Sequence, residues 1–483
     1  MVTLEELLGA GGRTVASGPD RFEHVAVDSR QVGPGDLFVA LRGERTDGHR
    51  FVLDAFAHGA GGALVREMPP SVPGGRTVVQ VTDPARTLWT LAERRRTRTP
   101  LRMVGVTGSV GKTTTKEFTA DLLATRYRTF RTRGNLNSEI GLPMSLLELT
   151  GREEAGVAEL GMRGPGEIRM LAELARPQVG VITNIGLSHI GRLGSQEAIA
   201  KAKAELFEAL PPDGVAILPG DEKFLPFLLS WATCEAWTVG TGPDDTVRAE
   251  DVTMDALGTR FTLVHGGERA TAYLLLKGGH FVLNALLAAA AARALGVPLR
   301  QLAEAMGTLR AQPGRARILH GRRYTVVDDA YNATPASVNA ALEVLMATEG
   351  ERHVAIVGEM RELGFFTRTA HLESGRAVAR SGADLLVAIG GVDADGLAEG
   401  ARQAGMPESA IRRVPDTVQA LEAVESWLRE GDAVLVKGAH ALGLECLVER
   451  LADTEAETES AERASSAPEE REKRIVGEGT GSA

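Results

Sequence analysis

Residues 101–116, LRMVGVTGSVGKTTTK, constrain the possible folds of this chain more than any other stretch. A short apolar run ends in a loop that contains Gly108 and Gly111, and a helical pattern begins at Lys112. Glycines let the backbone N–H groups of such a loop point at phosphate oxygens, and the start of the helix adds a partial positive charge. A strand, a glycine loop, a Lys-Thr pair and a helix in this order predict a phosphate-binding loop.

Two side chains of this loop have the chemistry that nucleotide phosphates need. Lys112 can neutralise the terminal phosphates, and the hydroxyl of Thr113 can bind Mg²⁺. The common pattern has a glycine five residues before Gly111, where this chain has Val106. The alternative is an ordinary strand-to-helix turn, which the flanking strand and helix patterns disfavour. The loop residues that we expect to contact nucleotide are Gly108, Ser109, Gly111, Lys112, Thr113 and Thr114.

Size and composition exclude several classes of protein. The chain has 483 residues, which is too long for one hydrophobic core and suggests three domains. Its formal net charge of −10 argues against a nucleic acid or an anionic membrane as partner. The N-terminus lacks a secretory signal pattern, and the most apolar helical stretch, 284–297, is too short to span a bilayer. Cys234 and Cys446 have no metal-site spacing and suggest a reducing compartment, so we expect a cytoplasmic protein.

The strand and helix patterns divide the chain into three α/β segments and a tail. Residues 1–99 alternate short strands with helices, and residues 100–312 repeat this rhythm around the phosphate loop. Residues 313–452 contain further strands separated by helices, which predicts another parallel sheet. Residues 453–483 are acidic and nearly devoid of apolar side chains, so we expect them to be disordered.

Two stretches interrupt the strand–helix rhythm. The basic segment 94–100 ends in proline and is interpreted as a linker. Residues 236–276 contain several short strand patterns without helices, which predicts an antiparallel insertion or edge.

Polar residues near strand ends and on helices are further candidates for the site. Glu159 ends a strand pattern, where a carboxylate beside a phosphate loop suits a second Mg²⁺ ligand. His189 lies just beyond the end of another strand pattern, and Lys201 and Lys203 lie on a helix whose other face is apolar. Taken alone, each of these side chains is more often an ordinary surface residue.

The second half of the chain adds four candidates for nucleotide contacts. Asn284 opens a helix after a Gly-Gly-His turn, where either recognition of a base edge or helix capping suits an asparagine. Arg315 offers a planar guanidinium for phosphate. Asp328 and Asp329 end a strand at the start of a turn.

Taken together and in order, these motifs resemble the Mur ligase family over about residues 1–450. The matching strings are VDSRQVGPGDLFVALRGERTDGH, GVTGSVGKTTTKE with its Val106, GNLNSEIGLP, ELGMRGPGEI, TNIGLSHIGRLGS, AKAELF, NALLAA, PGR, DDAYNATP, VGEMRELG and LVKG. The resemblance implies an α/β fold of three domains. These would be a UDP-binding domain at 1–99, a P-loop NTPase-like domain with a mostly parallel sheet at 100–312, and a Rossmann-like domain at 313–452.

The resemblance also implies cofactor roles for the candidate residues. Four side chains resemble ligands of two Mg²⁺ ions that accompany ATP: Thr113, Glu159, His189 and Lys203. Lys203 aligns with a lysine that is carbamylated in many family members, and Lys112, Lys203 and His189 would be catalytic. Asn284 resembles an adenine contact. Arg315 and Asp328 or Asp329 would reach ATP from the C-terminal domain.

Substrate contacts and an activity follow from the same resemblance. Ser29 and Arg30 resemble contacts to uridine diphosphate, and Asn135 and Asn137 resemble residues that line a substrate channel. The motifs are most similar to the branch that joins D-alanyl-D-alanine to UDP-N-acetylmuramoyl-tripeptide with ATP, through an acyl phosphate, in peptidoglycan synthesis. These two substrates are the implied partners of a monomer that binds neither nucleic acid nor membrane.

Two departures and three rivals accompany this interpretation. Phe281 follows His280 where the family often has asparagine, and His440 stands where many relatives have arginine, so we expect an altered adenine contact and a weaker or pH-dependent basic contact. A ligase that adds the diamino acid usually carries Asp-Asn-Pro-Arg, which this chain lacks. The UDP-binding motif disfavours folate polyglutamylation. The intact loop and metal-ligand residues disfavour a regulatory module without catalysis.

Overall fold

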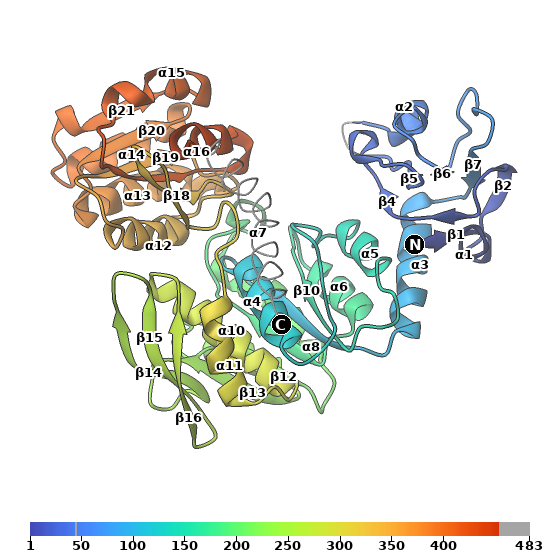
Figure 1. Ribbon diagram of the computed structural model, residues 1–483, viewed down its shortest axis with the longest axis horizontal. Helices are drawn as coiled ribbons and strands as arrows, with labels where there is room; N and C mark the ends of the chain where they lie inside the picture. The colour runs from blue at the N-terminus through green and yellow to red at the C-terminus, as the bar shows by residue number, and fades with distance from the viewer. Residues whose placement is uncertain (44–45, 454–483) are drawn as a thin grey trace, which may run out of the picture. The chain divides into compact units, whose positions relative to one another are not determined.

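The structure is a computed structural model that describes residues 1–43 and 46–453 (Figure 1). The described residues form three large sheets and one two-stranded sheet, and the predicted α/β fold class is confirmed. Contacts divide the chain into two compact units, the first ending at Arg310 and the second beginning at Ala311. The tail that we expect to be disordered lies, from residue 454 onward, outside the described residues.

A five-stranded sheet of order β2-β7-β6-β5-β4 forms the N-terminal part of the first unit. All its neighbouring strands are parallel except β2 and β7. The strands are β2 (Arg13–Ala16), β4 (Val25–Ala26), β5 (Leu37–Val39), β6 (Gly62–Val65) and β7 (Thr77–Gln80). The shorter elements are β1 (Val2–Thr3), α1 (Leu4–Gly9), β3 (Arg21–Phe22), the 3₁₀ turns Ser29–Gln31 and Gly48–Phe51, and α2 (Val52–Ala57).

Helix α3 (Pro84–Arg98) corrects the prediction of a linker at 94–100. The helix begins where the Asp83 side chain accepts hydrogen bonds from two backbone N–H groups, and it continues through the basic segment. The reason is Arg96, which is buried and donates to four backbone carbonyls, those of Thr99, Leu101, Ala175 and Arg176. The basic segment is therefore part of a helix that a buried arginine fixes to the rest of the unit, and it is not a solvent-exposed linker.

The central sheet has nine strands in the order β16-β15-β14-β13-β12-β11-β8-β10-β9. Neighbours from β9 to β14 are parallel, and β15 and β16 complete the sheet as antiparallel strands. The strands are β8 (Arg102–Thr107), β9 (Thr129–Arg131), β10 (Ala155–Glu159), β11 (Val179–Ile182), β12 (Val215–Pro219), β13 (Glu235–Gly240), β14 (Val247–Met254), β15 (Thr259–His265) and β16 (Glu268–Leu274). An antiparallel edge is thus present as predicted, and only β13 in that region belongs wholly to the parallel part.

The helices of this region complete the strand–helix alternation. They are α4 (Lys112–Ala124), α5 (Gly141–Leu146), α6 (Glu167–Ala175), α7 (Ile190–Leu193), α8 (Gln196–Glu208), α9 (Leu225–Leu229), α10 (Gly279–Ala294) and α11 (Leu299–Ala305). Because parallel strands end at the same edge of a sheet, the carboxyl ends of β8, β10 and β11 come together there.

Helix α10 packs along α4 and corrects the prediction that Asn284 opens a helix. The helix begins at Gly279, so Asn284 lies inside it and cannot serve as its N-cap. Phe281 is almost fully buried and its ring lies 6.4 Å from that of Phe118 in α4. The unusual phenylalanine is therefore a packing residue between the two helices.

The second unit is a six-stranded sheet of order β17-β18-β22-β19-β20-β21, in which only β17 is antiparallel. The strands are β17 (Arg317–His320), β18 (Thr325–Asp329), β19 (His353–Gly358), β20 (Leu385–Ile389), β21 (Ile411–Val414) and β22 (Ala433–Lys437). The helices are α12 (Pro335–Met346), α13 (Thr367–Ser381), α14 (Asp395–Gln403), α15 (Thr417–Trp427) and α16 (Glu445–Ala452). Helices α12 and α13 cover one face and α15 and α16 the other (Figure 1).

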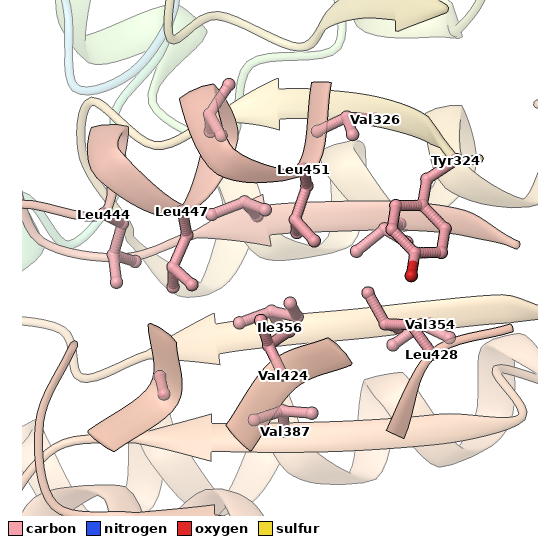
Figure 2. Close-up of a cluster of buried hydrophobic side chains, with 14 of the residues drawn as sticks. Tyr324, Val326, Val354, Ile356, Val387, Val424, Leu428, Leu444, Leu447 and Leu451 are labelled. Carbon is pink, nitrogen blue, oxygen red and sulfur yellow. The ribbon is translucent and has the colours of Figure 1, made fainter. Parts of the chain in front are cut away.

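Apolar side chains from the sheet and from two helices form a core of this unit. Figure 2 shows Val354, Ile356 and Val387 of the sheet beside Val424 of α15 and Leu447 of α16. Continuous apolar runs such as these are typical of parallel strands that are covered on both faces. The core holds β18, β22 and β19 rigidly, and their carboxyl ends carry the polar residues discussed below.

Candidate active site

Two glycines of the phosphate loop are required by its geometry. Gly108 has φ +150°, and a Cβ atom built there would lie 1.8 Å from the Thr183 hydroxyl. Gly111 has φ +83° and is the N-cap of α4, and a Cβ there would lie 2.7 Å from Oδ1 of Asn284. A side chain at either position would therefore strain the backbone and force a neighbouring group to move.

The segment after β11 supports the loop through Asn184. Its side-chain oxygen accepts from the N–H of Val110 at 3.0 Å, and its amide donates to the Val110 carbonyl at 2.9 Å. Its backbone carbonyl accepts from Ser109 N–H at 3.0 Å, and the Ser109 hydroxyl accepts from Gly186 N–H at 2.8 Å. These contacts fix the first turn of the loop and leave the α4 N-terminus as its phosphate-facing element.

Two lysines converge on one carbonyl oxygen of the loop. The Nζ atoms of Lys112 and Lys203 donate to the carbonyl of Gly108 at 2.9 Å and 2.8 Å. Burial, together with the positive charge of Lys112, lowers the pKa of Lys203 well below its ordinary value. Lys201, the other lysine considered on this helix, is exposed. The structure thus places Lys203, and not Lys201, at the loop.

Glu159 ends β10 beside the loop, and only one of its oxygens is hydrogen-bonded to protein. Oε1 accepts from the side-chain amide of Asn137 at 2.8 Å. Oε2 is buried and accepts no hydrogen bond from any residue that the structure describes. A buried, singly satisfied carboxylate near the first turn of α4, which contains Thr113, fits a Mg²⁺ ion, which prefers oxygen ligands. The described residues contain no group of three or more His, Cys, Asp or Glu side chains arranged for a metal ion.

His189 and Asn284 occupy different surroundings in the first unit. His189 is half-buried, has φ +65° and is the N-cap of α7. Asn284 is buried, and its Oδ1 accepts a hydrogen bond from the Thr115 hydroxyl at 3.3 Å. Asn284 therefore contacts the helix that follows the loop. The adenine contact of Asn284 and the metal contact of His189 stay predictions.

The other predicted contacts of the first unit lie apart from the loop in the sequence. Ser29 is buried, whereas the exposed Arg30 pairs with Asp28 at 2.6 Å. That pair is consistent with a backbone turn at the start of a 3₁₀ segment. Asn135 is exposed and Asn137 is held by Glu159. The uridine diphosphate and channel contacts of these residues also stay predictions.

The predicted residues of the second unit gather at the carboxyl ends of its strands. The guanidinium of Arg315 lies 3.9 Å from the ring centre of Tyr331, which stacks on His440 at 5.5 Å. Asp328 accepts from Gly314 N–H at 2.7 Å. Asp328 thus fixes the turn that carries Arg315.

A buried ion pair beside these residues was not predicted as a pair. Lys437 lies 2.6 Å from Asp329 and also donates to the Asn332 carbonyl at 2.9 Å. Burial raises the pKa of Asp329 and lowers the pKa of Lys437. The ion pair links the last residues of β18 and β22, which are neighbouring parallel strands.

Sequence reasoning also missed Asn184 as a structural partner of the loop and Lys116 as a buried, fully hydrogen-bonded residue of α4. Asn184 lies within the string TNIGLSHIGRLGS, where only the histidine has an obvious chemical signature. Lys116 follows the Lys-Thr pair by three residues and reads as an ordinary helix residue, although it is fully buried. No local pattern distinguishes either residue from its surface counterparts.

Comparisons with known proteins agree with this architecture. Residues 106–292 match the Mur ligase middle domain, residues 314–440 match the Mur ligase glutamate ligase domain, and residues 21–96 match the catalytic domain of the Mur ligase family. The chain belongs to the Mur ligase family.

Individual relatives show which members of that family are similar to this chain over most of its length. The chain is 36% identical to the UDP-N-acetylmuramoyl-tripeptide--D-alanyl-D-alanine ligase of Bacillus subtilis, over 89% of this chain and 93% of that protein. The crystal structure of MurF from Acinetobacter baumannii superposes with a TM-score of 0.81 at 30% identity, covering 93% of this chain and 98% of the other. MurF ligase from Thermotoga maritima in complex with ADP gives 0.75 at 27% identity, covering 89% and 97%.

Among the described residues, every helix is too short or too polar to cross a membrane. The cytoplasmic location and the monomeric state stay predictions.

Proposed function

We propose that this protein is an ATP-dependent ligase that joins D-alanyl-D-alanine to the terminal carboxylate of UDP-N-acetylmuramoyl-tripeptide, with release of ADP and phosphate. The observation that carries the proposal is the supported phosphate loop, with two lysines on one carbonyl oxygen, in a chain similar to ligases of this name over nearly its whole length. Peptidoglycan precursor synthesis in the cytoplasm is the corresponding process.

The chemistry would proceed in two steps. The peptide carboxylate attacks the γ-phosphate of ATP, forming an acyl phosphate and releasing ADP. The amine of D-alanyl-D-alanine then attacks the activated carbonyl, losing a proton as the amide forms and phosphate leaves. Phosphoryl transfer depends mainly on positioning and charge neutralisation, which Lys112 and the α4 N-terminus would provide. Exclusion of water protects the acyl phosphate from hydrolysis.

Magnesium and a modified lysine would complete the site. Thr113 and Glu159 would hold one Mg²⁺ ion, and the unsatisfied Oε2 of Glu159 supports this assignment. His189 and a carbamylated Lys203 would hold the second. Burial lowers the pKa of Lys203, which favours its neutral amine, and a neutral amine is the form that adds carbon dioxide. Bound Mg²⁺ supplies charge neutralisation for the phosphates.

A phosphate-release assay tests the proposed activity. Purified protein is mixed with ATP and Mg²⁺, and then with the UDP-linked tripeptide, with D-alanyl-D-alanine, or with both. We expect sustained phosphate release and a new amide product only when both substrates are present. Steady ATP hydrolysis without them would instead indicate a nucleotide-driven regulatory protein. Tripeptides with different third residues, assayed in parallel, identify the accepted diamino acid.

A further inference from the structure

Lys116 is a fully buried cation that the chemistry above does not use. Its side chain has no exposed surface, and Nζ donates to the carbonyls of Thr132 and Gly134 at 2.8 Å and 3.2 Å. The third contact is with Oε1 of Glu117 at 2.7 Å. All three donors of the ammonium group are therefore used. A buried charge with a complete set of partners tends to hold one arrangement of its surroundings, because leaving any partner is costly.

The charge of Lys116 belongs to a short ionic ladder between α4 and β9. Oε2 of Glu117 lies 2.7 Å from Arg131, and Arg131 lies 2.8 Å from Asp121. Arg131 is the last residue of β9, a three-residue strand at the edge of the sheet. Helix α4, which begins at the phosphate loop, thus holds the edge strand and the segment that follows it.

That following segment, residues 132–137, contacts Glu159 in two ways. The backbone N–H of Glu159 donates to the Thr132 hydroxyl at 3.1 Å. The Asn137 amide donates to Oε1 of Glu159 at 2.8 Å, and the Asn137 carbonyl accepts from Gly161 N–H at 2.8 Å. Backbone and side chain of Glu159 are therefore both positioned by the segment whose carbonyls Lys116 binds.

From these contacts we propose that Lys116 is a positioning residue, which acts through Thr132 and Asn137 to set Glu159 for Mg²⁺ and to hold segment 132–137 for the carboxylate substrate. This inference rests on the proposed function for its substrate part. The contacts of its Nζ atom are all with protein groups, so Lys116 would act without touching ATP or the reacting atoms. It couples the helix of the phosphate loop to the segment that contacts Glu159.

The variant Lys116→Met tests the coupling, because methionine fills similar space without charge or donors. The first readout is binding of a non-hydrolysable ATP analogue by calorimetry at increasing Mg²⁺, which needs no turnover. We expect the Mg²⁺ concentration for half-maximal effect to rise about tenfold, while affinity without Mg²⁺ stays unchanged. The second readout is steady-state kinetics, where KM for the UDP-linked tripeptide rises and KM for D-alanyl-D-alanine does not.

A matched control separates positioning from general stability. Arg128 directly precedes β9 and forms an exposed ion pair with Glu154, so Arg128→Met removes a cation beside that strand without touching segment 132–137. This control variant should leave unchanged the Mg²⁺ concentration for half-maximal effect and both KM values. A merely structural role of Lys116 would reduce the active fraction, and hence kcat alone. The proposal would be overturned if folded Lys116→Met protein kept the wild-type Mg²⁺ concentration for half-maximal effect and the wild-type KM for the UDP-linked tripeptide.

A second variant serves if Lys116→Met protein does not fold. Thr132→Val keeps the carbonyl that Lys116 binds and removes only the hydroxyl that accepts from Glu159. We expect the Mg²⁺ concentration for half-maximal effect to rise about threefold in Thr132→Val protein, and an unchanged concentration would likewise overturn the proposal. If wild-type protein binds the analogue with Mg²⁺ but shows no ligation, the proposed function fails while the binding readout still decides the role of Lys116.

Discussion

The backbone conformation at Gly111 allows a test of how tightly Asn284 is packed against the phosphate loop. Gly111 and Gly166 are both N-caps of helices, with φ of +83° and +84°. A Cβ at Gly166 would meet no atom within 4 Å, whereas a Cβ at Gly111 would lie 2.7 Å from Oδ1 of Asn284. The two positions therefore share the same backbone strain and differ in one contact.

The expected stability losses follow from that difference. An alanine at positive φ costs about 1 kcal/mol at either position. At Gly111 the new methyl group must also displace the Asn284 side chain, which breaks its hydrogen bond with Thr115 and disturbs the packing of α10 on α4. We expect Gly111→Ala to lose about 1–2 kcal/mol more free energy of unfolding than Gly166→Ala.

Urea denaturation of both variants, followed by circular dichroism, measures this gap. The same pair is then made in an Asn284→Ala background, which removes the three atoms nearest to the methyl group at Gly111, all of them in the Asn284 side chain. The gap should close there, because only the shared backbone strain remains. Equal losses in the original background, or a full gap in the absence of the Asn284 side chain, would refute the packing that we describe.

Three further residues allow direct tests. Lys112→Ala should abolish phosphate release while leaving the circular dichroism spectrum unchanged, and wild-type turnover would remove the loop from the mechanism. Lys203→Ala should reduce ligation about 100-fold or more, with partial rescue by formate or acetate, and full activity would contradict the carbamate. Because burial lowers the pKa of Lys203, the unfolded chain binds more protons than the folded chain between that lowered pKa and the ordinary lysine pKa; in protein without the carbamate the free energy of unfolding should therefore rise with pH over this range, and Lys203→Met should flatten that slope in urea titrations at several pH values. Arg96→Met should cost about 3 kcal/mol by urea denaturation, since four carbonyls lose their donor, whereas exposed Arg98→Met should cost nothing measurable.

Features with a local pattern could be predicted from the sequence. The strand before the phosphate loop, the helix after it and the position of Glu159 at a strand end are all as expected. In the second unit, the strands β18, β19, β20 and β22 coincide with apolar runs, since strands covered on both faces need little else. The family resemblance then followed from the order of the motifs.

Features that depend on distant partners could not be predicted in the same way. Asn184 supports Val110 from 74 residues away, and Arg96 is buried by carbonyls about 80 residues later in the chain. Both read as ordinary polar residues until the sheet brings those segments together. The predicted start of α10 at Asn284 is wrong, because asparagine is a common N-cap residue but the N-cap of this helix is Gly278.

The two margins of the nine-stranded sheet bear on how the chain behaves at high concentration. Unpaired strand margins invite pairing with another copy, which leads to aggregation. One margin, β9, has only three residues and ends in a ladder of charges, and the other, β16, contacts helix α11. Short edge strands, charged side chains and contact with a helix all reduce such pairing in natural sheets. These features disfavour pairing of either margin with a second copy of the chain.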